Sequence, residues 1–306
     1  MKRAIVTGAN GFVGSALCRE LTGQGIAVTA VVREHANIDS VKDLDNISII
    51  ECDLSDFKNL AGYIGEPGAD VFYHLAWIGS AGDKRGNSDI QINNIKYTCD
   101  TVKACAELQC KRYVFASSIM EYEIAALMNT ENVPEINTLY SSAKIAADYM
   151  ARTIAGDLKV DYIRAVISNI YGPGESSPRL VNTSIRKLLA GEHCSFSEGR
   201  QMYDFIYITD AAKAFVKLGE MGISNRTYYI GSTEPKQLRE FLMEIRDVVS
   251  PQADIGLGEI PFLGVSLDYG EFDVHSVQKD TGFTPEVAFK DGVRMTAEWI
   301  RGNGNG

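Results

Sequence analysis

The sequence predicts an α/β fold, in which a doubly wound parallel sheet is followed by a smaller C-terminal α/β lobe. A glycine-rich turn at residues 8–14 joins an apolar strand to a helix at the start of the chain. Apolar runs of strand length then alternate with segments of helical spacing up to residue 168, the pattern of repeated strand–helix–strand units. A Gly/Pro break at residues 172–174 ends this regular alternation.

The apolar runs are continuous rather than alternating, as in strands that are buried on both faces of a sheet. Strands are expected at residues 4–7, 27–32, 47–54, 71–76, 111–118 and 162–167, with helices at 15–21, 90–108 and 140–154 and a variable loop before the last of these. Beyond the break we expect helices at 180–190, 236–249 and 291–301, strands at 205–208 and 227–231, and irregular structure at 251–270.

Composition excludes several classes of protein. The chain has 306 residues, 45% of them hydrophobic, and a formal charge of −10, which disfavours nucleic acid or an anionic membrane surface as a partner. No apolar run reaches the roughly 20 residues that span a bilayer, and because the sequence enters a strand directly we expect no signal peptide. The six cysteines form no Cys-x-x-Cys pair and the four histidines show no ligand spacing, which indicates a cytoplasmic protein without a metal site.

The glycine turn has the properties of a dinucleotide-binding loop. Gly8 permits a tight turn with unusual φ, Gly11 allows close approach of a pyrophosphate, and Gly14 allows the helix to pack against the strand. Free N–H groups at the start of the helix favour a negatively charged ligand. We therefore expect the turn to bind a nicotinamide dinucleotide through these glycines and the residues between them, Asn10, Phe12 and Val13.

The end of the second strand bears on the choice of cofactor. NAD enzymes usually place Asp or Glu there to accept from the ribose 2′-hydroxyl. This chain has Val32 followed by Arg33, and a guanidinium can pair with a 2′-phosphate. The sequence therefore favours NADP(H), with NAD(H) possible if Arg33 is solvated and Glu34 binds the ribose.

Three further positions are expected beside the cofactor. Asp53 and Leu54 end the third strand over the adenine side, where Asp53 either accepts from the adenine amino group or caps the next helix. Leu75 and Ala76 end the fourth strand with groups that suit packing against a cofactor. Asn94 interrupts the apolar face of the helix at 90–108 and is expected to reach back to the sheet.

Tyr140, Lys144 and Ser118 form the candidate catalytic group. Tyr140 and Lys144 are one helical turn apart and share a face. A tyrosine has a pKa near 10, and a neighbouring ammonium group is expected to lower it toward neutrality. Ser118 ends the fifth strand, where its hydroxyl can hold a substrate oxygen. Together they allow proton transfer at oxygen while a nicotinamide exchanges hydride at carbon.

With these residues in place, the sequence resembles the extended short-chain dehydrogenases/reductases of the NAD-dependent epimerase/dehydratase group. The resemblance implies a Rossmann domain, the Ser118–Tyr140–Lys144 catalytic triad, cofactor contacts from Tyr140 and Lys144, and a nucleotide-sugar substrate contacted by Asn169. It also implies a homodimer formed through the helices at 90–108 and 140–154. The matching motifs are Thr7–Gly14, Asp53-Leu54, His74-Leu75-Ala76, Asn94, Ser117-Ser118, Tyr140–Lys144, Asn169–Gly174 and Asp204–Asp210.

The resemblance also gives an expected division of the chain. Residues 1–168 form the NAD(P)-binding domain, to which 203–230 return. Residues 169–202 and 231–301 form the substrate-binding lobe. The Gly-Asn-Gly-Asn-Gly end, residues 302–306, is expected to be a flexible tail.

The departures from the family pattern narrow the activity. Sugar-nucleotide 4,6-dehydratases have Asp-Glu directly after the catalytic hydroxyl, where this chain has Ile119 and Met120, so a dehydratase is disfavoured. Tyr203 stands where many members have an arginine that pairs with a substrate phosphate. We count Tyr203 as substrate-binding together with Ser118, Asn169 and Arg179. The arginines able to take over the phosphate contact are Arg179, Arg186 and Arg200.

The leading hypothesis is NADPH-dependent reduction of a 4-keto-(6-deoxy)hexose nucleotide. The first alternative is a nucleotide-sugar 4-epimerase with tightly bound NAD, and another is a non-catalytic dinucleotide-binding sensor. A reductase of small non-sugar carbonyls would be favoured by an apolar pocket around Trp77, Met120 and Phe196.

Overall fold

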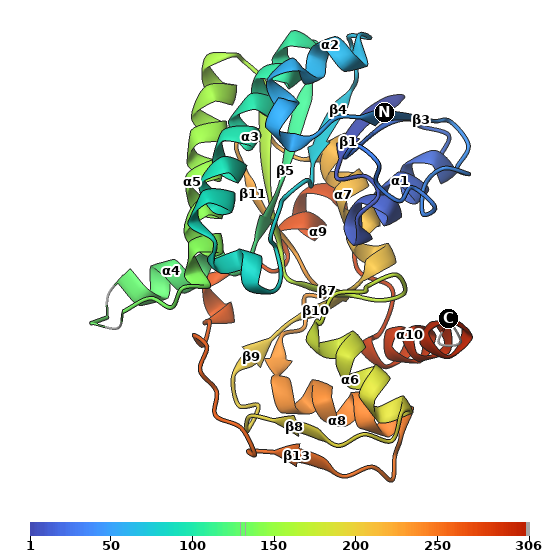
Figure 1. Cartoon of the computed structure of the whole chain (residues 1–306), viewed down its shortest axis with the longest axis vertical. Helices are drawn as coiled ribbons and strands as arrows, with labels where there is room; N and C mark the ends of the chain where they lie inside the picture. The colour runs from blue at the N-terminus through green and yellow to red at the C-terminus, as the bar shows by residue number, and fades with distance from the viewer. Residues whose placement is uncertain (129, 132, 304–306) are drawn as a thin grey trace.

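The computed structural model describes residues 1–128, 130, 131 and 133–303, and its centre is a seven-stranded parallel sheet (Figure 1). The strand order is β11-β6-β5-β4-β1-β2-β3, and each neighbouring pair runs parallel. The strands are β1 (Arg3–Thr7), β2 (Ala27–Val32), β3 (Ile47–Glu51), β4 (Val71–His74), β5 (Arg112–Ser118), β6 (Asp161–Ile167) and β11 (Thr227–Ile230). The predicted fold class is confirmed.

The order of the strands reverses beside β1. From β1 the chain proceeds outward to β2 and β3, then crosses back to β4 on the other side of β1. Such a switch leaves a crevice at the carboxyl ends of the two central strands, where ligands bind in this class of sheet. The glycine turn and Leu75-Ala76 both lie at this crevice, because each directly follows one of these strands.

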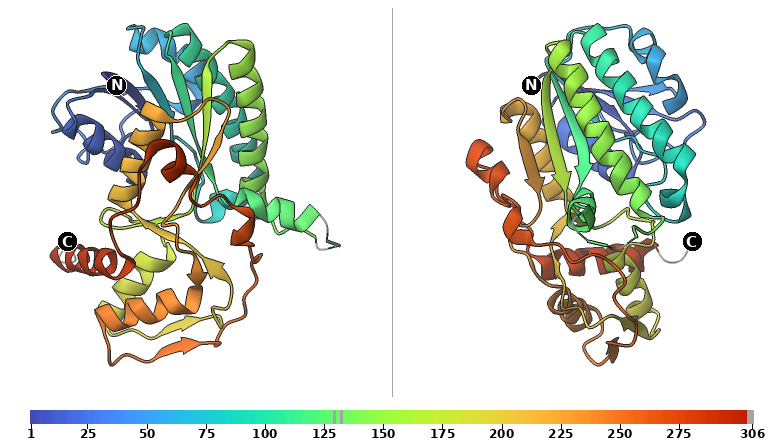
Figure 2. Two further views of the ribbon diagram at one scale, coloured as in Figure 1. Left: turned by 180° about the vertical axis from the view of Figure 1, so that it is seen from behind. Right: turned by 90° about the vertical axis from the view of Figure 1, so that its left-hand side faces the viewer.

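Helices cover both faces of the sheet, as the edge-on view shows (Figure 2). Adjacent β1 residues face opposite ways: Val6 packs with Leu17 of α1, whereas Ile5 packs in the core that contains Val102 and Ala147. One face carries α1 (Phe12–Gly23), α7 (Ile208–Met221) and α9 (Ser276–Thr281). The other carries α3 (Ser88–Glu107) and α5 (Thr138–Asp157), with the short η1 (Leu54–Asn59) and α2 (Leu60–Ile64).

The rest of the chain lies beyond the carboxyl ends of the sheet strands (Figure 1). It contains three strand pairs, parallel β7–β10 and β8–β13 and antiparallel β9–β12, packed with three helices. The helices are α6 (Leu180–Leu189), α8 (Leu238–Val249) and α10 (Phe289–Asn303). The strands are β7 (Asn169–Tyr171), β8 (Cys194–Phe196), β9 (Met202–Tyr203), β10 (Phe205–Tyr207), β12 (Lys236–Gln237) and β13 (Ile255–Leu257).

Three sequence expectations differ from the structure. The variable loop after β5 contains helix α4 (Glu121–Met128), which begins with the buried Glu121 held by Arg164 of β6. The segment expected to be irregular contains β13, which pairs with β8, and the one-turn η3 (Tyr269–Glu271). Helix α10 extends through Asn303, so the expected tail is helical at residues 302 and 303, and residues 304–306 lie outside the described residues. Helix α4 and strand β13 were not predicted because each depends on a partner far away in the sequence: Arg164 for α4, and β8 for β13. The expected division into domains stays a prediction.

Candidate active site

The glycine turn is fixed by close backbone packing. Gly8 has φ of +71°, in the left-handed region that favours glycine, and its N–H donates to Val31 O of the neighbouring strand at 3.1 Å. A Cβ on Gly14 would lie far inside contact distance of Gly8 O, and one on Gly11 would be 3.2 Å from the same atom. The turn therefore provides a cradle that side chains would fill, and α1 begins directly after it at Phe12.

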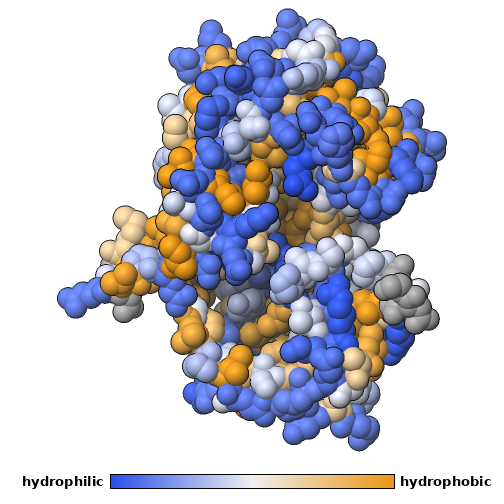
Figure 3. Space-filling model, in the orientation of Figure 1, coloured by the Kyte–Doolittle hydropathy of each residue, from blue (hydrophilic) through white to orange (hydrophobic). Residues whose placement is uncertain are grey.

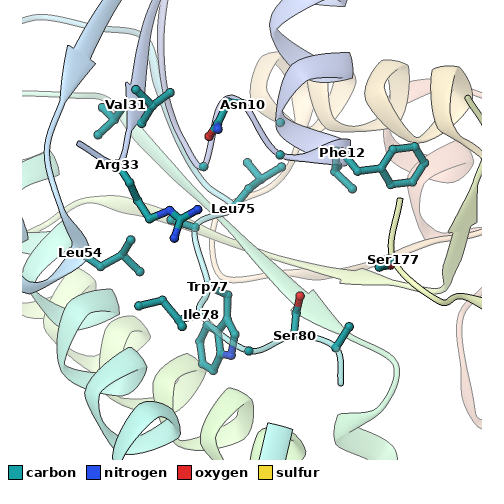
Figure 4. Close-up of a pocket in the computed structure, with 18 of the residues that line it drawn as sticks. Asn10, Phe12, Val31, Arg33, Leu54, Leu75, Trp77, Ile78, Ser80 and Ser177 are labelled. Carbon is teal, nitrogen blue, oxygen red and sulfur yellow. The ribbon is translucent and has the colours of Figure 1, made fainter. Parts of the chain in front are cut away.

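A cavity of about 470 Å³ opens above this turn, in the recess between the sheet and the C-terminal part of the chain (Figures 3 and 4). Most of the predicted cofactor residues line it: Gly8, Asn10, Gly11, Phe12, Val13, Gly14, Arg33, Leu54, Leu75 and Ala76. The sequence analysis missed the contribution of Val31, Cys52, Phe57, Trp77, Ile78, Gly79, Ser80, Ala81, Lys84, Glu175, Ser176 and Ser177 as cavity residues. Except for Val31, which lies within β2, these residues follow β3, β4 or β7, so the ends of predicted strands could have indicated them.

Four predicted cofactor residues do not line this cavity: Asp53, Asn94, Tyr140 and Lys144. Asn94 is buried, and its side chain accepts from Ile78 N at 3.1 Å and donates to Ile78 O at 2.8 Å. Asn94 therefore holds the segment after β4 in place. Asp53 stands before η1 without a side-chain cap hydrogen bond, so the proposed capping contact is not made.

Arg33 directly follows β2, and its side chain points into the cavity (Figure 4). The preceding Val32 is buried and apolar, so the end of this strand presents no carboxylate to the cavity. Glu34, the alternative ribose acceptor, is exposed and does not line the cavity.

The candidate catalytic residues come together at the end of β5. Tyr140 on α5 is 7% exposed, and burial raises the pKa of its phenol although a hydrogen bond with Ser118 lowers it. The guanidinium of Arg85, which lies on the short η2 (Asp83–Gly86), stands 4.8 Å from the centre of the Tyr140 ring. The contact with Ser118 brings the phenol and the strand-end hydroxyl to one point.

Lys144 does not act on Tyr140 as the sequence suggested. Its Nζ donates to Ala116 O at 2.8 Å and lies 3.8 Å from the centre of the Trp77 ring. Burial lowers the pKa of Lys144 to about 7, and the carboxylate of Glu121 opposes this shift. The prediction that Lys144 lowers the pKa of Tyr140 is therefore wrong for this structure, because desolvation dominates at both groups.

A buried network of charged side chains holds the end of β5 at Ser118. This network was not predicted from the sequence. Glu121 accepts hydrogen bonds from the Ser118 backbone N–H at 3.2 Å and from the Ser117 hydroxyl, and it forms an ion pair with Arg164. Arg164 also pairs with Asp148 of α5, 3.5 Å away. The signal was an arginine within the apolar run of β6 and a carboxylate three residues after Ser118.

The predicted substrate residues occupy two places. Asn169 and Tyr203 line a small cavity next to Met120, and Asn169 Nδ2 donates to Asp204 O at 3.0 Å. Arg179 instead lines the cavity above the glycine turn and forms an ion pair with Glu175, 3.1 Å away.

The other two candidate arginines are also in different places. Arg186 donates to Glu175 O at 2.5 Å. Arg200 pairs with Glu198 at 2.6 Å and lines a cavity of about 690 Å³ between the segments 198–201 and 258–266. Arg200 and Arg179 therefore line different cavities.

The residues described by the structure contain no group of three or more His, Cys, Asp or Glu side chains placed to hold a metal ion. Likewise, none of the helices in the described part of the chain is long and apolar enough to cross a membrane.

Comparison with known proteins gives the class. The sequence model of the NAD dependent epimerase/dehydratase family matches residues 4–231. The dTDP-glucose 4,6-dehydratase of Neisseria gonorrhoeae is 26% identical over 99% of this chain and 96% of its own length. The UDP-glucose 4-epimerase of Mycolicibacterium smegmatis is 25% identical over 98% of each chain. A UDP-N-acetylglucosamine 4-epimerase structure from Methanobrevibacter ruminantium, 23% identical, superimposes with a TM-score of 0.81 over 99% of both chains.

The chain belongs to the NAD dependent epimerase/dehydratase family, and it is an enzyme of the extended short-chain dehydrogenase/reductase superfamily. The expected family is thereby confirmed.

Proposed function

We propose that the chain is a nucleotide-sugar 4-epimerase that acts with a tightly bound NAD. The grouping of Ser118 and Tyr140 beside Lys144, at the sheet end that carries the glycine turn, is the observation that supports this most directly. The family is NAD dependent, and 4-epimerases of UDP-glucose and UDP-N-acetylglucosamine are among the proteins that this chain resembles. This alternative among the sequence hypotheses therefore has more support than the leading one, the NADPH-dependent reductase.

The cavity fits a dinucleotide. The Gly8–Gly14 cradle leaves room for a pyrophosphate at the start of α1, where free N–H groups and the helix dipole favour negative charge. Leu54, Leu75 and Ala76 supply apolar walls. A bound nicotinamide would supply the hydride acceptor and donor for the sugar carbon.

Tyr140 and Ser118 would act at the sugar oxygen. In an epimerisation Tyr140, as its phenolate, would take the proton of the sugar hydroxyl while the carbon loses hydride, and would return a proton to the same oxygen when hydride comes back. Burial raises the pKa of this phenol, which favours the proton-donating half of the cycle. Ser118 would hold the same oxygen by its hydroxyl, which already contacts the phenol. Because one oxygen is protonated and deprotonated in turn, both directions of an epimerisation use the same two side chains.

The surroundings of Ser118 disfavour a dehydratase. Elimination needs an additional acid and base, but the next residue, Ile119, is apolar and 2% exposed, and Met120 has no proton to transfer. Glu121 is engaged by Arg164 and Ser117, which removes it from such a role. Oxidation and reduction at a single carbon need no such additional acid and base, so Ser118, Tyr140 and a nicotinamide would be sufficient for them.

A second candidate is supported by Arg33. A guanidinium pointing into the cavity, without a carboxylate at the end of β2, favours a 2′-phosphate and therefore NADPH-dependent reduction of a 4-keto-(6-deoxy)hexose nucleotide. The third sequence hypothesis, a non-catalytic sensor, has less support because the chain is a family enzyme with all three side chains present.

Two incubations, one without added cofactor and one with NADPH and a 4-keto nucleotide sugar, separate the candidates. Purified enzyme is mixed with UDP-glucose or dTDP-glucose, and products are followed by NMR. An epimerase forms the 4-epimer without added cofactor and without net change in reduced nicotinamide absorbance. Consumption of NADPH with a 4-keto nucleotide sugar, and no epimer, would favour the reductase.

We also propose a homodimer formed through α3 and α5. These helices pack side by side on one face of the sheet, and they expose Ile92, Tyr149 and Met150. Light scattering after size exclusion should give twice the mass of 33.5 kDa, and Tyr149→Lys should shift it toward the monomer.

A further inference from the structure

A further cavity, of about 390 Å³, lies next to Ser118 and Tyr140. Its wall includes Met120, whose backbone N–H donates to the Ser118 hydroxyl at 3.2 Å. It shares Met120, Glu123, Gly264 and Val265 with the small cavity of Asn169 and Tyr203, so the two spaces meet at Glu123. A sugar held by Ser118 and Tyr140 would face this wall.

Arg85 contributes a guanidinium to this cavity. The side chain is half-buried and stacked on the Tyr140 ring, and its Nε is buried with no hydrogen-bond acceptor among the described residues. Removing such a donor from water without giving it an acceptor is unfavourable. A guanidinium held in this way is placed to donate to a ligand.

Glu123 contributes a carboxylate to the same space. One of its oxygens accepts from Ser141 Oγ at 3.2 Å, and Ser141 is the residue after Tyr140. Burial raises the pKa of Glu123, whereas the charge of Arg85 lowers it. Glu135 lines the same cavity, so two carboxylates accompany one guanidinium, which disfavours a phosphate or a sugar carboxylate there.

A guanidinium and a carboxylate on one wall match a hydroxyl group, because a hydroxyl accepts from the first and donates to the second. The Arg85 guanidinium lies over the phenol that would serve the oxygen at carbon 4. In a bound sugar it would therefore lie on the side of carbons 3 and 5, which neighbour carbon 4. The diphosphate, attached at carbon 1, lies across the sugar ring from that point.

We propose that Arg85 and Glu123 bind a hydroxyl group next to the reacting carbon, at carbon 3 or carbon 6, and thereby select hydroxylated over deoxygenated nucleotide sugars. This inference rests on the proposed function. It also opposes the 6-deoxy sugar of the sequence hypothesis if the hydroxyl is at carbon 6. A site built around a substrate hydroxyl discriminates strongly, since the analogue leaves buried polar groups unpaired.

The test compares UDP-glucose with its 3-deoxy and 6-deoxy analogues, and the dTDP-linked set in parallel, using the full NAD-loaded chain. We expect the wild type to prefer the parent sugar to at least one analogue by about 100-fold in kcat/KM. Glu123→Gln and Arg85→Met should reduce that preference to below about tenfold. Arg85→Lys should restore part of it. Asp83→Asn, exposed on the same turn as Arg85, is the control and should leave it unchanged.

The outcomes are distinguishable. Equal use of all three sugars by the wild type overturns this inference alone, as do variants that slow parent and analogues by the same factor. If the wild type turns over no nucleotide sugar, the proposed function fails and this inference fails with it. Circular dichroism and thermal unfolding of each variant separate loss of recognition from loss of fold.

Discussion

The ammonium group of Lys144 lies 3.8 Å from the centre of the Trp77 ring. The same indole meets the Tyr140 ring edge to face, with 6.0 Å between centroids, and its Nε1 donates to Gln91 Oε1 at 3.0 Å. Gln91 is buried on α3 and donates in turn to Gly79 O and Lys84 O. Trp77 therefore connects Tyr140 and Lys144 to the segment after β4 that lines the cofactor cavity.

Trp77 should report cofactor binding. The chain has two tryptophans, and Trp77 lines the cavity above the glycine turn. In a Trp299→Phe protein, NADH should quench the remaining fluorescence, because reduced nicotinamide absorbs where indole emits. Trp77→Phe should lose most of this response. Unchanged emission from the Trp77-only protein, with NADH binding measured by calorimetry, would contradict the placement of Trp77.

Tyr140→Phe and Ser118→Ala should lower kcat by about 10²–10⁴-fold, because each removes a group that handles the substrate oxygen. Affinity for NAD should change little, since the cradle at Gly8–Gly14 is untouched. Tyr149→Phe, on the exposed side of the same helix, is the control. Turnover within a few-fold of wild type for Tyr140→Phe would remove Tyr140 from the mechanism.

Gly14→Ala should destabilise the chain by about 1–3 kcal/mol, because the added methyl group is forced against Gly8 O. Gly23→Ala is a matched control on the same helix, since its Cβ would meet nothing within 4 Å. That control should be neutral or stabilising by up to about 1 kcal/mol. Urea unfolding measures both, and equal effects would contradict the packing of α1 against the turn.

Lys144 should give stability a pH dependence in the cofactor-free chain. Its pKa is about 7 when folded and 10.5 for the free side chain, so the unfolded state binds more protons between these values. The contribution of Lys144 to the free energy of unfolding therefore rises with pH across this window. Relative to wild type, Lys144→Met should gain more in melting temperature near about pH 6 than near about pH 9.

The exposed Lys58→Met is the control for that pH series. A melting-temperature difference between Lys144→Met and wild type that stays constant, or grows with pH, would show that Lys144 is not buried as described.

Arg33→Asp should weaken NADPH binding by about tenfold or more and leave NADH equal or tighter, because a carboxylate repels the 2′-phosphate and accepts from a 2′-hydroxyl. Calorimetry with both cofactors measures this. Glu34→Ala tests the alternative: a selective loss of NADH affinity in that variant, with no effect of Arg33→Asp on NADPH, would assign the ribose to Glu34.

Local pattern was enough to predict much of this molecule. The apolar runs predicted where the sheet strands lie along the chain, and the four-residue spacing placed Tyr140 and Lys144 on one helix face. The Gly8–Gly14 turn was predictable because the strain of a left-handed φ and the clash of a Cβ are properties of a few consecutive residues.

Contacts between distant segments were decided only by the tertiary structure. Helix α4 begins at the buried pair of Glu121 with Arg164, 43 residues apart. Arg85 of η2 contacts the ring of Tyr140 on α5, and the ammonium group of Lys144 lies over the ring of Trp77, which follows β4.

The pKa shifts of Tyr140 and Lys144 show what the sequence determined and what only the folded chain determined. The sequence placed an ammonium one turn from a phenol and so suggested a lowered pKa for Tyr140. Folding removed both groups from water, and desolvation raised the pKa of Tyr140 and lowered that of Lys144. Sequence spacing determines which groups are neighbours, but burial depends on every segment packed around them, and only the assembled chain determines it.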